Sequence, residues 1–255
     1  MHSEKIINNQ IIFYSEYKYN DKQYNIEMLL DSQEFKIFLW KLIDKYNIII
    51  WWDGTMLQAI NKYHTNWRKF IWINFWNKWF LLQNKKIILK ENNFIDKTYS
   101  LFNVEINWKK YWTFVNEINI TANWGKIWEF SVKIWDKNNF NIKWDGLIIA
   151  TPLWSTAYNN SLWWPILSHE SNSIVITSKA LIQPKNLPSI VLNDNKTIII
   201  KSIWRFHWLG IYLDWQWEEI DTENTEIIIK KSEYKLTLSI WESEWENWEN
   251  KIFEF

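Results

Sequence analysis

The chain has 255 residues, a formal net charge of zero and no cysteine. It is long enough to bury a sizeable core, whereas the balanced charge excludes the basic surface that binding to nucleic acid or to an anionic membrane requires. No apolar run reaches transmembrane length, the first residues lack a signal-peptide pattern, and the four histidines lack ligand spacing, so we predict a cytoplasmic protein without a histidine metal site.

Residues 1–95 alternate between strand and helix patterns, which is typical of an α/β domain. A strand is expected from Lys5 to Tyr14 and a helix from Ser32 to Tyr46. The apolar run Ile48 to Ile50 then predicts a strand buried on both faces, and a second helix is expected to run to about His64.

Between this strand and helix lies the segment Trp51-Trp52-Asp53-Gly54-Thr55. A buried strand that ends in an acid, a glycine and a hydroxyl commonly holds a phosphate, because backbone N–H groups of the turn and of the helix N-terminus point at the anion. Two indoles would fill the space that the phosphate needs, whereas glycine would leave it open. The alternative is an ordinary strand-to-helix turn in which Asp53 caps the helix.

The composition bears on these two tryptophans. The chain contains 23 Trp and only 4 Gly, although glycine averages about 7% of globular proteins. Many tryptophans lie beside turn residues, where glycine is the usual residue, as in the segments starting at Asn66, Asn123, Asp214 and Asn247. We interpret the chain as the product of a gene in which UGA encodes glycine, translated with a table that reads UGA as tryptophan. The alternative is a chain that is rich in genuine tryptophan.

From residue 96 the pattern changes to short alternating strands separated by turn residues, which predicts an all-β, β-sandwich-like domain over 96–235. The expected strands are Lys109–Asn116, Glu117–Ala122, Lys126–Ile134, Asn139–Lys143, Gly146–Ala150, Ser173–Ile176, Ser189–Leu192, Thr197–Ile203, Gly210–Leu213, Thr225–Lys230 and Lys235–Ile240. Residues 236–255 are acidic and repetitive, and we expect them to form a flexible tail.

Two segments resemble motifs of a known protein family when each of their tryptophans is read as glycine. Residues 51–55 become GGDGT, which occurs in NAD kinases and in lipid and diacylglycerol kinases. Lys143 to Pro165 becomes KGDGLIIATPLGSTAYNNSLGGP, which resembles the NAD kinase signature GDGL…TPTGSTAY…S…GGP, with Leu153 where the family usually has Thr. Lipid kinases lack the TPxGSTAY run. The sequence therefore resembles the NAD kinase family over roughly residues 45–217.

Three shorter segments agree with this resemblance. Lys69 to Leu82 is similar to the family's second motif, a strand followed by a glycine-rich loop. Asn116-Glu117 resembles its Asn-Glu pair, and Tyr212 to Gln216 resembles a strand that ends in DGQ. Taken alone, Asn116-Glu117 would suit a solvated strand end, and Ala180 and Gln216 would suit structural positions.

The resemblance implies an α/β domain joined to a β-sandwich-like domain. It also implies transfer of a phosphoryl group from ATP, or from polyphosphate, to the 2′-hydroxyl of the adenosine ribose of NAD, with Mg²⁺ or another divalent metal. Asp53 is expected to be the general base. The phosphate-binding turn comprises Trp51, Trp52, Gly54 and Thr55.

The same resemblance implies a dinucleotide site in which Asn116 and Glu117 reach ribose and adenine and Asp145 accepts from the nicotinamide carboxamide. Tyr158 offers a ring face to adenine. The full predicted set is Asp53, Gly54, Asn116, Glu117, Lys143, Asp145, Leu153, Thr156, Ala157, Tyr158, Asn159, Asn160, Ser161, Ala180 and Gln216.

Other functions remain open at this point. A non-catalytic NAD(P)-binding sensor of the same fold would bind dinucleotide without transferring phosphate. A lipid kinase would share GGDGT, and a genuine tryptophan-rich surface would bind ligands by indole stacking. The predicted partners are small molecules and further copies of the chain, in a dimer or tetramer, rather than nucleic acid or membranes.

Overall fold

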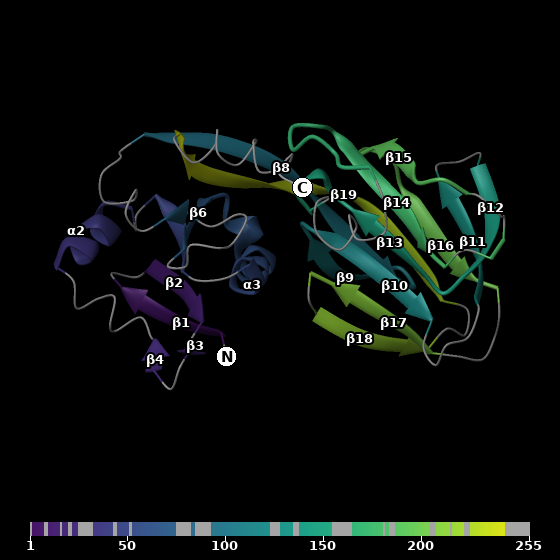
Figure 1. The fold of residues 1–255 in the computed structure, drawn as a ribbon, viewed down its shortest axis with the longest axis horizontal. Coiled ribbons are helices and arrows are strands. Elements are labelled where there is room, and N and C mark those ends of the chain that lie inside the picture. The colour runs from purple at the N-terminus through teal and green to yellow at the C-terminus, as the bar shows by residue number, and fades with distance from the viewer. Residues whose placement is uncertain are drawn as a thin grey trace. The chain divides into compact units, whose positions relative to one another are not determined.

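The computed structural model describes most of the chain as two compact units (Figure 1). The described residues are 2–7, 10–15, 17–19, 22–24, 33–42, 45–50, 53–74, 83–84, 93–122, 128–134, 138–154, 165–180, 182–183, 187–203, 208–214, 216–221 and 225–242. The first unit comprises Met1–Thr98 and Tyr234–Phe255, and the second comprises Tyr99–Glu233.

The first unit is an α/β structure. Its elements are β1 (His2–Ile7), β2 (Gln10–Ser15), β3 (Tyr17–Tyr19), β4 (Lys22–Tyr24), α2 (Gln33–Leu42), β5 (Tyr46–Ile50), α3 (Asp53–Tyr63), the 3₁₀ helix η1 (His64–Asn66), β6 (Lys69–Asn74) and β7 (Gln83–Asn84). Strand β5 lies between β2 and β6 and is parallel to both. The first unit thus contains the predicted strand and helix in the expected order, as β5 and α3.

Burial explains why β5 and α3 form where they do. The last three residues of β5, Ile48 to Ile50, are at most 1% exposed, as the continuous apolar run predicts. In α3 the buried residues Met56, Leu57 and Ile60 lie on one stripe, and the helix contacts β5 and β2. The strand before residues 51–52 and the helix after them are therefore both well packed.

The second unit is a β-sandwich. Its elements are β8 (Phe94–Ile106), β9 (Lys109–Phe114), β10 (Glu117–Ala122), β11 (Trp128–Ile134), β12 (Asn138–Trp144), β13 (Gly146–Ala150), the 3₁₀ helix η3 (Pro152–Trp154), β14 (Ser173–Lys179), β15 (Ile190–Asn193), β16 (Ile198–Ser202), β17 (Trp208–Leu213), β18 (Gln216–Asp221) and β19 (Glu226–Trp241). Residues 94–98 of β8 and 234–241 of β19 belong to the first unit. One sheet has the order β15-β14-β13-β10-β17-β18, and the other contains β9, β8, β19, β16, β11 and β12.

A single apolar core joins the two sheets. It contains inward side chains of both, for example Ile118 and Ile149 from the six-stranded sheet and Phe130 and Ile200 from the other. This arrangement is the expected one for antiparallel strands whose alternate residues face a common core.

The other face of the six-stranded sheet is partly covered as well. Every residue of β13 is buried, and Ile148, Ala150 and Val175 form a second cluster with Leu167. Leu167 belongs to the segment that follows the predicted TPLWSTAY run. Leu167 thus packs against the outward face of β13.

Two long strands were not expected. Residues 94–106 form one strand, β8, and the two strands predicted over 225–240 are a single 16-residue strand, β19. Residues 236–241 of the predicted tail belong to β19, and residues 243–255 lie outside the described part of the chain. Among the described residues, no helix has the length and apolar character that crossing a membrane requires.

Candidate dinucleotide-binding site

Three predicted motifs meet at one corner of the six-stranded sheet. Glu117, at the start of β10, pairs with Ala150 at the end of β13. Ile118 pairs with Leu213 at the end of β17. Because neighbouring strands in this sheet are antiparallel, the beginning of one strand meets the ends of the strands on either side. The Asn-Glu, TPLW and Asp-Trp-Gln segments are therefore close in space although up to about a hundred residues separate them.

Asp214 anchors this corner from one side. Its Oδ2 accepts a hydrogen bond from the backbone N–H of Val115 at 2.9 Å, and its Oδ1 accepts from the N–H groups of Asn116 at 2.9 Å and Glu117 at 3.2 Å. The side chain is buried. A single carboxylate thus binds three consecutive backbone donors.

Thr151 anchors the corner from the other side. Its Oγ1 donates to the carbonyl of Val115 at 2.6 Å, and its backbone N–H donates to the carbonyl of Asn116 at 2.9 Å. The residue is 2% exposed. The segment before β10 is therefore held between the β17–β18 turn and the start of the TPLW segment.

Side chains at this corner carry polar atoms that have no partner in the described part of the chain. Asn116 is 1% exposed, and neither amide atom has a hydrogen-bond partner among the described residues. The same holds for Glu117 Oε2 and for Asn119 Oδ1. Buried polar atoms are nearly always hydrogen-bonded in native proteins. Four such atoms on three residues of one four-residue stretch therefore make this corner a candidate site for a polar ligand.

Asn119 was not among the predicted site residues. It lies two residues after Glu117 in β10, so both side chains are on the outward face of the sheet. The alternation of strand residues was the available signal, because Ile118 and Ile120 face the core on either side of Asn119.

The electrostatics of the corner are unusual for carboxyl groups. The pKa of Glu117 is raised to about 7, chiefly by burial and also by the negative charge of Asp214, while Lys179 opposes the shift. Burial likewise raises the pKa of Asp214 to about 7 against the lowering effect of its three backbone hydrogen bonds. The pKa of Lys179 is lowered by burial, which the charge of Glu117 opposes.

Lys179 reaches this face because Gly146 has no side chain. The two residues are paired across β13 and β14. A Cβ atom on Gly146 would lie 2.8 Å from the carbonyl oxygen of Ile120 and 3.0 Å from Cδ of Lys179. The glycine of the predicted GDGL motif is thus needed for close packing, and it leaves room for a cation on the face that carries Glu117.

The remaining predicted residues of the second unit lie at two other places. Asp145 and Ala180 occupy bends at the opposite end of β13, where the Asp145 N–H donates to the carbonyl of Lys179 at 3.3 Å and Ala180 has a left-handed φ of 40°. Lys143 lies in β12, with its Nζ 3.5 Å from a carboxylate oxygen of Glu129. Leu153 is 1% exposed in η3 and is a core residue.

The predicted phosphate-binding residues have only partly described positions. Asp53 and Gly54 are the first two residues of α3, and the third, Thr55, is fully buried. Gln216 begins β18. The predicted residues outside the described part of the chain are Trp51, Trp52, Thr156, Ala157, Tyr158, Asn159, Asn160 and Ser161.

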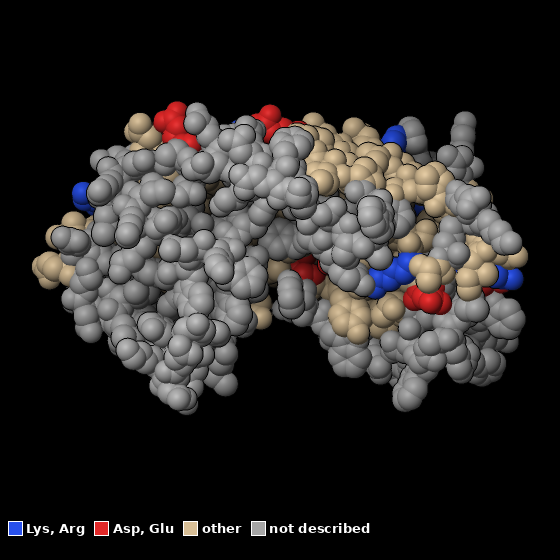
Figure 2. Space-filling model, in the orientation of Figure 1, with Lys and Arg blue, Asp and Glu red and all other residues tan. Residues whose placement is uncertain are grey.

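Charge on the molecular surface agrees with the composition. On the face shown in Figure 2, acidic and basic side chains of the described residues lie interspersed, without a field of one sign among them. Such a surface does not favour a polyanionic macromolecule.

The fold is that of enzymes that phosphorylate nicotinamide dinucleotides. The solved structure of yeast NADH kinase complexed with NADH superposes with a TM-score of 0.69 at 17% identity, over 83% of this chain and 67% of that one. An NAD kinase from Archaeoglobus fulgidus, solved with ATP, gives a TM-score of 0.64 at 18% identity and 82% coverage of both chains.

Sequence comparison gives the family. An NAD kinase of Fusobacterium nucleatum is 34% identical over 189 residues, which cover 68% of this chain and 69% of the relative. No protein-family model matches the chain. At this identity and coverage, the chain belongs to the NAD kinase family.

Proposed function

We propose that this chain is an NAD kinase, which transfers the terminal phosphoryl group of ATP, or a phosphoryl group of polyphosphate, to the 2′-hydroxyl of the adenosine ribose of NAD. The observation that carries the proposal is the corner at Asn116 and Glu117. Its backbone is held on both sides, while its buried side chains keep polar atoms without partners among the described residues.

Dinucleotide recognition follows from this chemistry. The two oxygens of the Glu117 carboxylate match the spacing of a vicinal ribose diol. The amide of Asn116 offers both a donor and an acceptor, and Asn119 adds an acceptor on the same face. We propose that Asp145 and residues 156–161 complete the binding of NAD, as the resemblance implies.

The reaction itself is assigned to the turn before α3. We propose that Asp53 accepts the proton of the 2′-hydroxyl as its oxygen attacks the phosphoryl group. Backbone N–H groups at the start of α3 would stabilise the charge on the donor phosphates, as they do at other helix N-termini. In this chemistry, positioning and electrostatic stabilisation provide most of the acceleration.

A divalent metal is part of the proposed reaction. A bound Mg²⁺ supplies neutralisation of the charge on the donor phosphates. Mg²⁺ is usually bound by phosphate oxygens and water with only one or two carboxylates. Among the described residues, no three His, Asp or Glu side chains form a group that could hold a metal. We therefore propose that the metal enters with the phosphoryl donor.

We also propose that most tryptophans at turns stand for glycine. Trp108 is the second residue of the two-residue turn between β8 and β9, where Ile106 pairs with Lys109. Asn107 and Trp108 have φ angles of 49° and 68°. This is the geometry of a type I′ turn, for which Asn-Gly is the favoured sequence. The indole of Trp108 is 75% exposed, so no packing explains its presence.

Trp67 supports the same proposal at the end of a helix. It follows η1 with a φ of 60° and is 79% exposed. Glycine is the common residue at this position, because its lack of a Cβ removes the cost of a left-handed backbone. By contrast, Trp241 is fully buried with its ring centroid 4.7 Å from that of Phe94. We propose that Trp67 and Trp108 stand for glycine and that Trp241 is genuine.

The main test compares two recombinant chains, one with every tryptophan retained and one with glycine at each position except Trp241. NADP formation from NAD, ATP and Mg²⁺ only in the glycine chain would support both proposals. Turnover by the tryptophan chain would overturn the recoding, as would indole-containing peptides at Trp51, Trp52 and Trp154 in mass spectra of the native protein. NAD binding without turnover in either chain would instead favour a dinucleotide sensor.

The role of Asp53 has a separate test. Asp53→Asn should reduce kcat by about 10²–10⁴-fold, the usual contribution of a general base, with the Kd for NAD within about threefold of the parent. Asp96→Asn is the matched control, because Asp96 also lies in the first unit but binds Lys69 and Ser239. Near-parental turnover of Asp53→Asn would remove Asp53 from the base role.

A further inference from the structure

The carboxylate of Asp214 has no role in the function proposed above, although it lies at the centre of the Asn116–Glu117 corner. It is buried, and it belongs to the turn that connects β17 to β18, where Leu213 pairs with Gln216. Its φ of 45° lies in the left-handed region, which aspartate tolerates better than most residues. This backbone conformation accompanies a side chain that binds the neighbouring chain segment rather than solvent.

The contacts of Asp214 complete the hydrogen bonding of three residues. Each N–H of Val115, Asn116 and Glu117 donates to its carboxylate. The carbonyls of Val115 and Asn116 accept from Thr151, and the carbonyl of Glu117 accepts from the N–H of Asp214 at 3.3 Å. All six backbone polar groups of this segment are therefore paired.

Complete backbone pairing has a consequence for the side chains. A segment with unpaired N–H groups could rotate its peptides toward water or toward the ligand, which would reorient the side chains of Asn116 and Glu117. Three consecutive N–H groups that converge on one point form an anion-binding concavity. Here the protein's own carboxylate occupies that concavity, so the segment is ordered before any ligand binds.

We propose that Asp214 is a positioning residue of the dinucleotide site, which fixes the backbone of Val115 to Glu117 so that the side chains of Asn116 and Glu117 are pre-ordered for NAD. The proposal rests on the function proposed above. It concerns NAD and not the phosphoryl donor, because the residues that Asp214 holds are those assigned to the dinucleotide.

Asp214→Asn is the direct test, made in whichever of the two recombinant chains forms NADP. The amide keeps one acceptor oxygen but presents an NH₂ group to backbone donors, so at least one of the three hydrogen bonds is lost. We expect the KM and Kd for NAD to rise at least about tenfold, as hydrogen bonds to a charged group warrant, while the KM for ATP changes less than about threefold.

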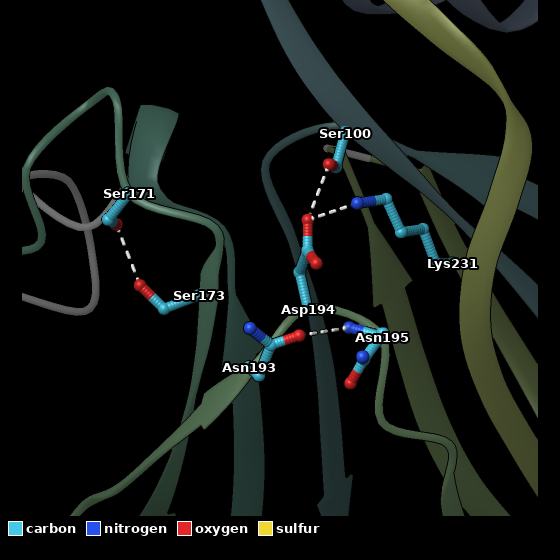
Figure 3. A network of polar contacts seen from close by, with 7 residues as sticks. All are labelled: Ser100, Ser171, Ser173, Asn193, Asp194, Asn195 and Lys231. Atoms are coloured by element: carbon cyan, nitrogen blue, oxygen red, sulfur yellow. Dashed lines mark hydrogen bonds and ion pairs between the residues drawn. The ribbon is translucent and has the colours of Figure 1, made fainter.

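Asp194 provides a matched control in the same unit. It is also buried, but its Oδ2 accepts from Ser100 Oγ at 2.7 Å and from Lys231 Nζ at 2.5 Å (Figure 3), and neither partner belongs to the Asn116–Glu117 corner. Asp194→Asn should lower the melting temperature and leave the Kd for NAD unchanged. If Asp214→Asn behaves like Asp194→Asn, with a lower melting temperature and a Kd for NAD within twofold of the parent, the proposal is wrong.

A second variant covers the case in which Asp214→Asn does not fold. Thr151→Val keeps the shape of the side chain but removes the hydrogen bond to the Val115 carbonyl, and we expect a smaller rise of about threefold in the Kd for NAD. An unchanged Kd in this variant would also overturn the proposal. If the parent binds NAD but forms no NADP, the kinase proposal fails and calorimetric Kd values still test Asp214. A parent that does not bind NAD would overturn both.

Discussion

Two hairpin turns of the second unit are built alike but serve different surroundings. Asn107-Trp108 connects β8 to β9, and Asp214-Trp215 connects β17 to β18. In each turn the first residue is left-handed, with φ of 49° and 45°. The N–H of Asn107 donates to the carbonyl of Glu226, and the N–H of Asp214 donates to the carbonyl of Glu117. In return, the backbone N–H of Glu226 donates to the Asn107 side chain, and that of Glu117 donates to the Asp214 side chain.

The difference lies in what each turn holds. Asn107 Oδ1 accepts one N–H, from Glu226, whose carboxylate forms an ion pair with Lys201. Asp214 accepts three, and the side chains of Asn116 and Glu117 beside it retain atoms without partners among the described residues. Glu226 also keeps one buried atom, Oε1, without a partner among the described residues, so neither turn chemistry nor one unpaired atom marks a functional site. The Asn116–Glu117 corner differs because such atoms occur on three nearby residues, Asn116, Glu117 and Asn119.

Truncation of the glutamate beside each turn tests most directly whether only one of the two turns supports a binding site. Glu117→Ala should weaken NAD binding about 100-fold, because a carboxylate that accepts from two ribose hydroxyls contributes on the order of 3 kcal/mol. Glu226→Ala is the matched control and should leave the Kd for NAD unchanged. Calorimetry measures both. Equal effects of the two variants would show that the corner has no special role.

The pH dependence of NAD binding provides a second test of the difference between Glu117 and Glu226. Since the pKa of Glu117 is raised to about 7, the carboxylate is mainly ionised at pH 8 and mainly protonated at pH 6. We expect NAD to bind about tenfold more weakly at pH 6 than at pH 8, because the ionised form is the better acceptor. Glu117→Gln should reduce this dependence and leave only the part that comes from titration of Asp214, whereas Glu226→Gln should retain it in full.

Glu117 and Asp214 also make the stability of the folded protein depend on pH, in the direction opposite to that of NAD binding. The pKa values of Glu117 and Asp214 are raised in the folded state, so the folded protein binds more protons than the unfolded chain between their ordinary values and about 7. Their contribution to the free energy of unfolding should therefore fall as pH rises through this range. Asp214→Asn should flatten part of the slope measured by chemical denaturation without NAD; an unchanged slope would contradict the assignment.

A change in the Asn107-Trp108 turn should have a small effect, and on stability alone. Trp108→Gly should stabilise the protein by about 1 kcal/mol, because it removes a side chain from a left-handed backbone position and loses little buried area. Trp108→Ala should give no such gain, since alanine keeps the Cβ. Thermal unfolding measures the difference, and a lower melting temperature for the glycine variant would count against glycine at this position.

Much of the fold could be predicted from local patterns. The apolar run Ile48 to Ile50 predicted a buried strand, and the short alternating segments predicted most strands of the sandwich within a few residues. The extents of β8 and β19 could not be predicted, because strand length depends on which partner pairs along it. Polar residues such as Lys230 and Lys231 interrupt the apolar pattern of β19 without ending the strand.

The candidate site, like the fold, could be predicted from the sequence only where its signals are local. Sequence alone determined the family resemblance and drew attention to Asn116, Glu117 and the Asp-Trp-Gln segment, because those motifs are local. Only the tertiary structure decided that Lys143 forms an ion pair with Glu129 and that Asn119 shares the face of Glu117. The role of Asp214 is likewise tertiary. Its hydrogen bonds join residues 97 to 99 positions apart, and such contacts exist only once antiparallel pairing brings the strand ends together.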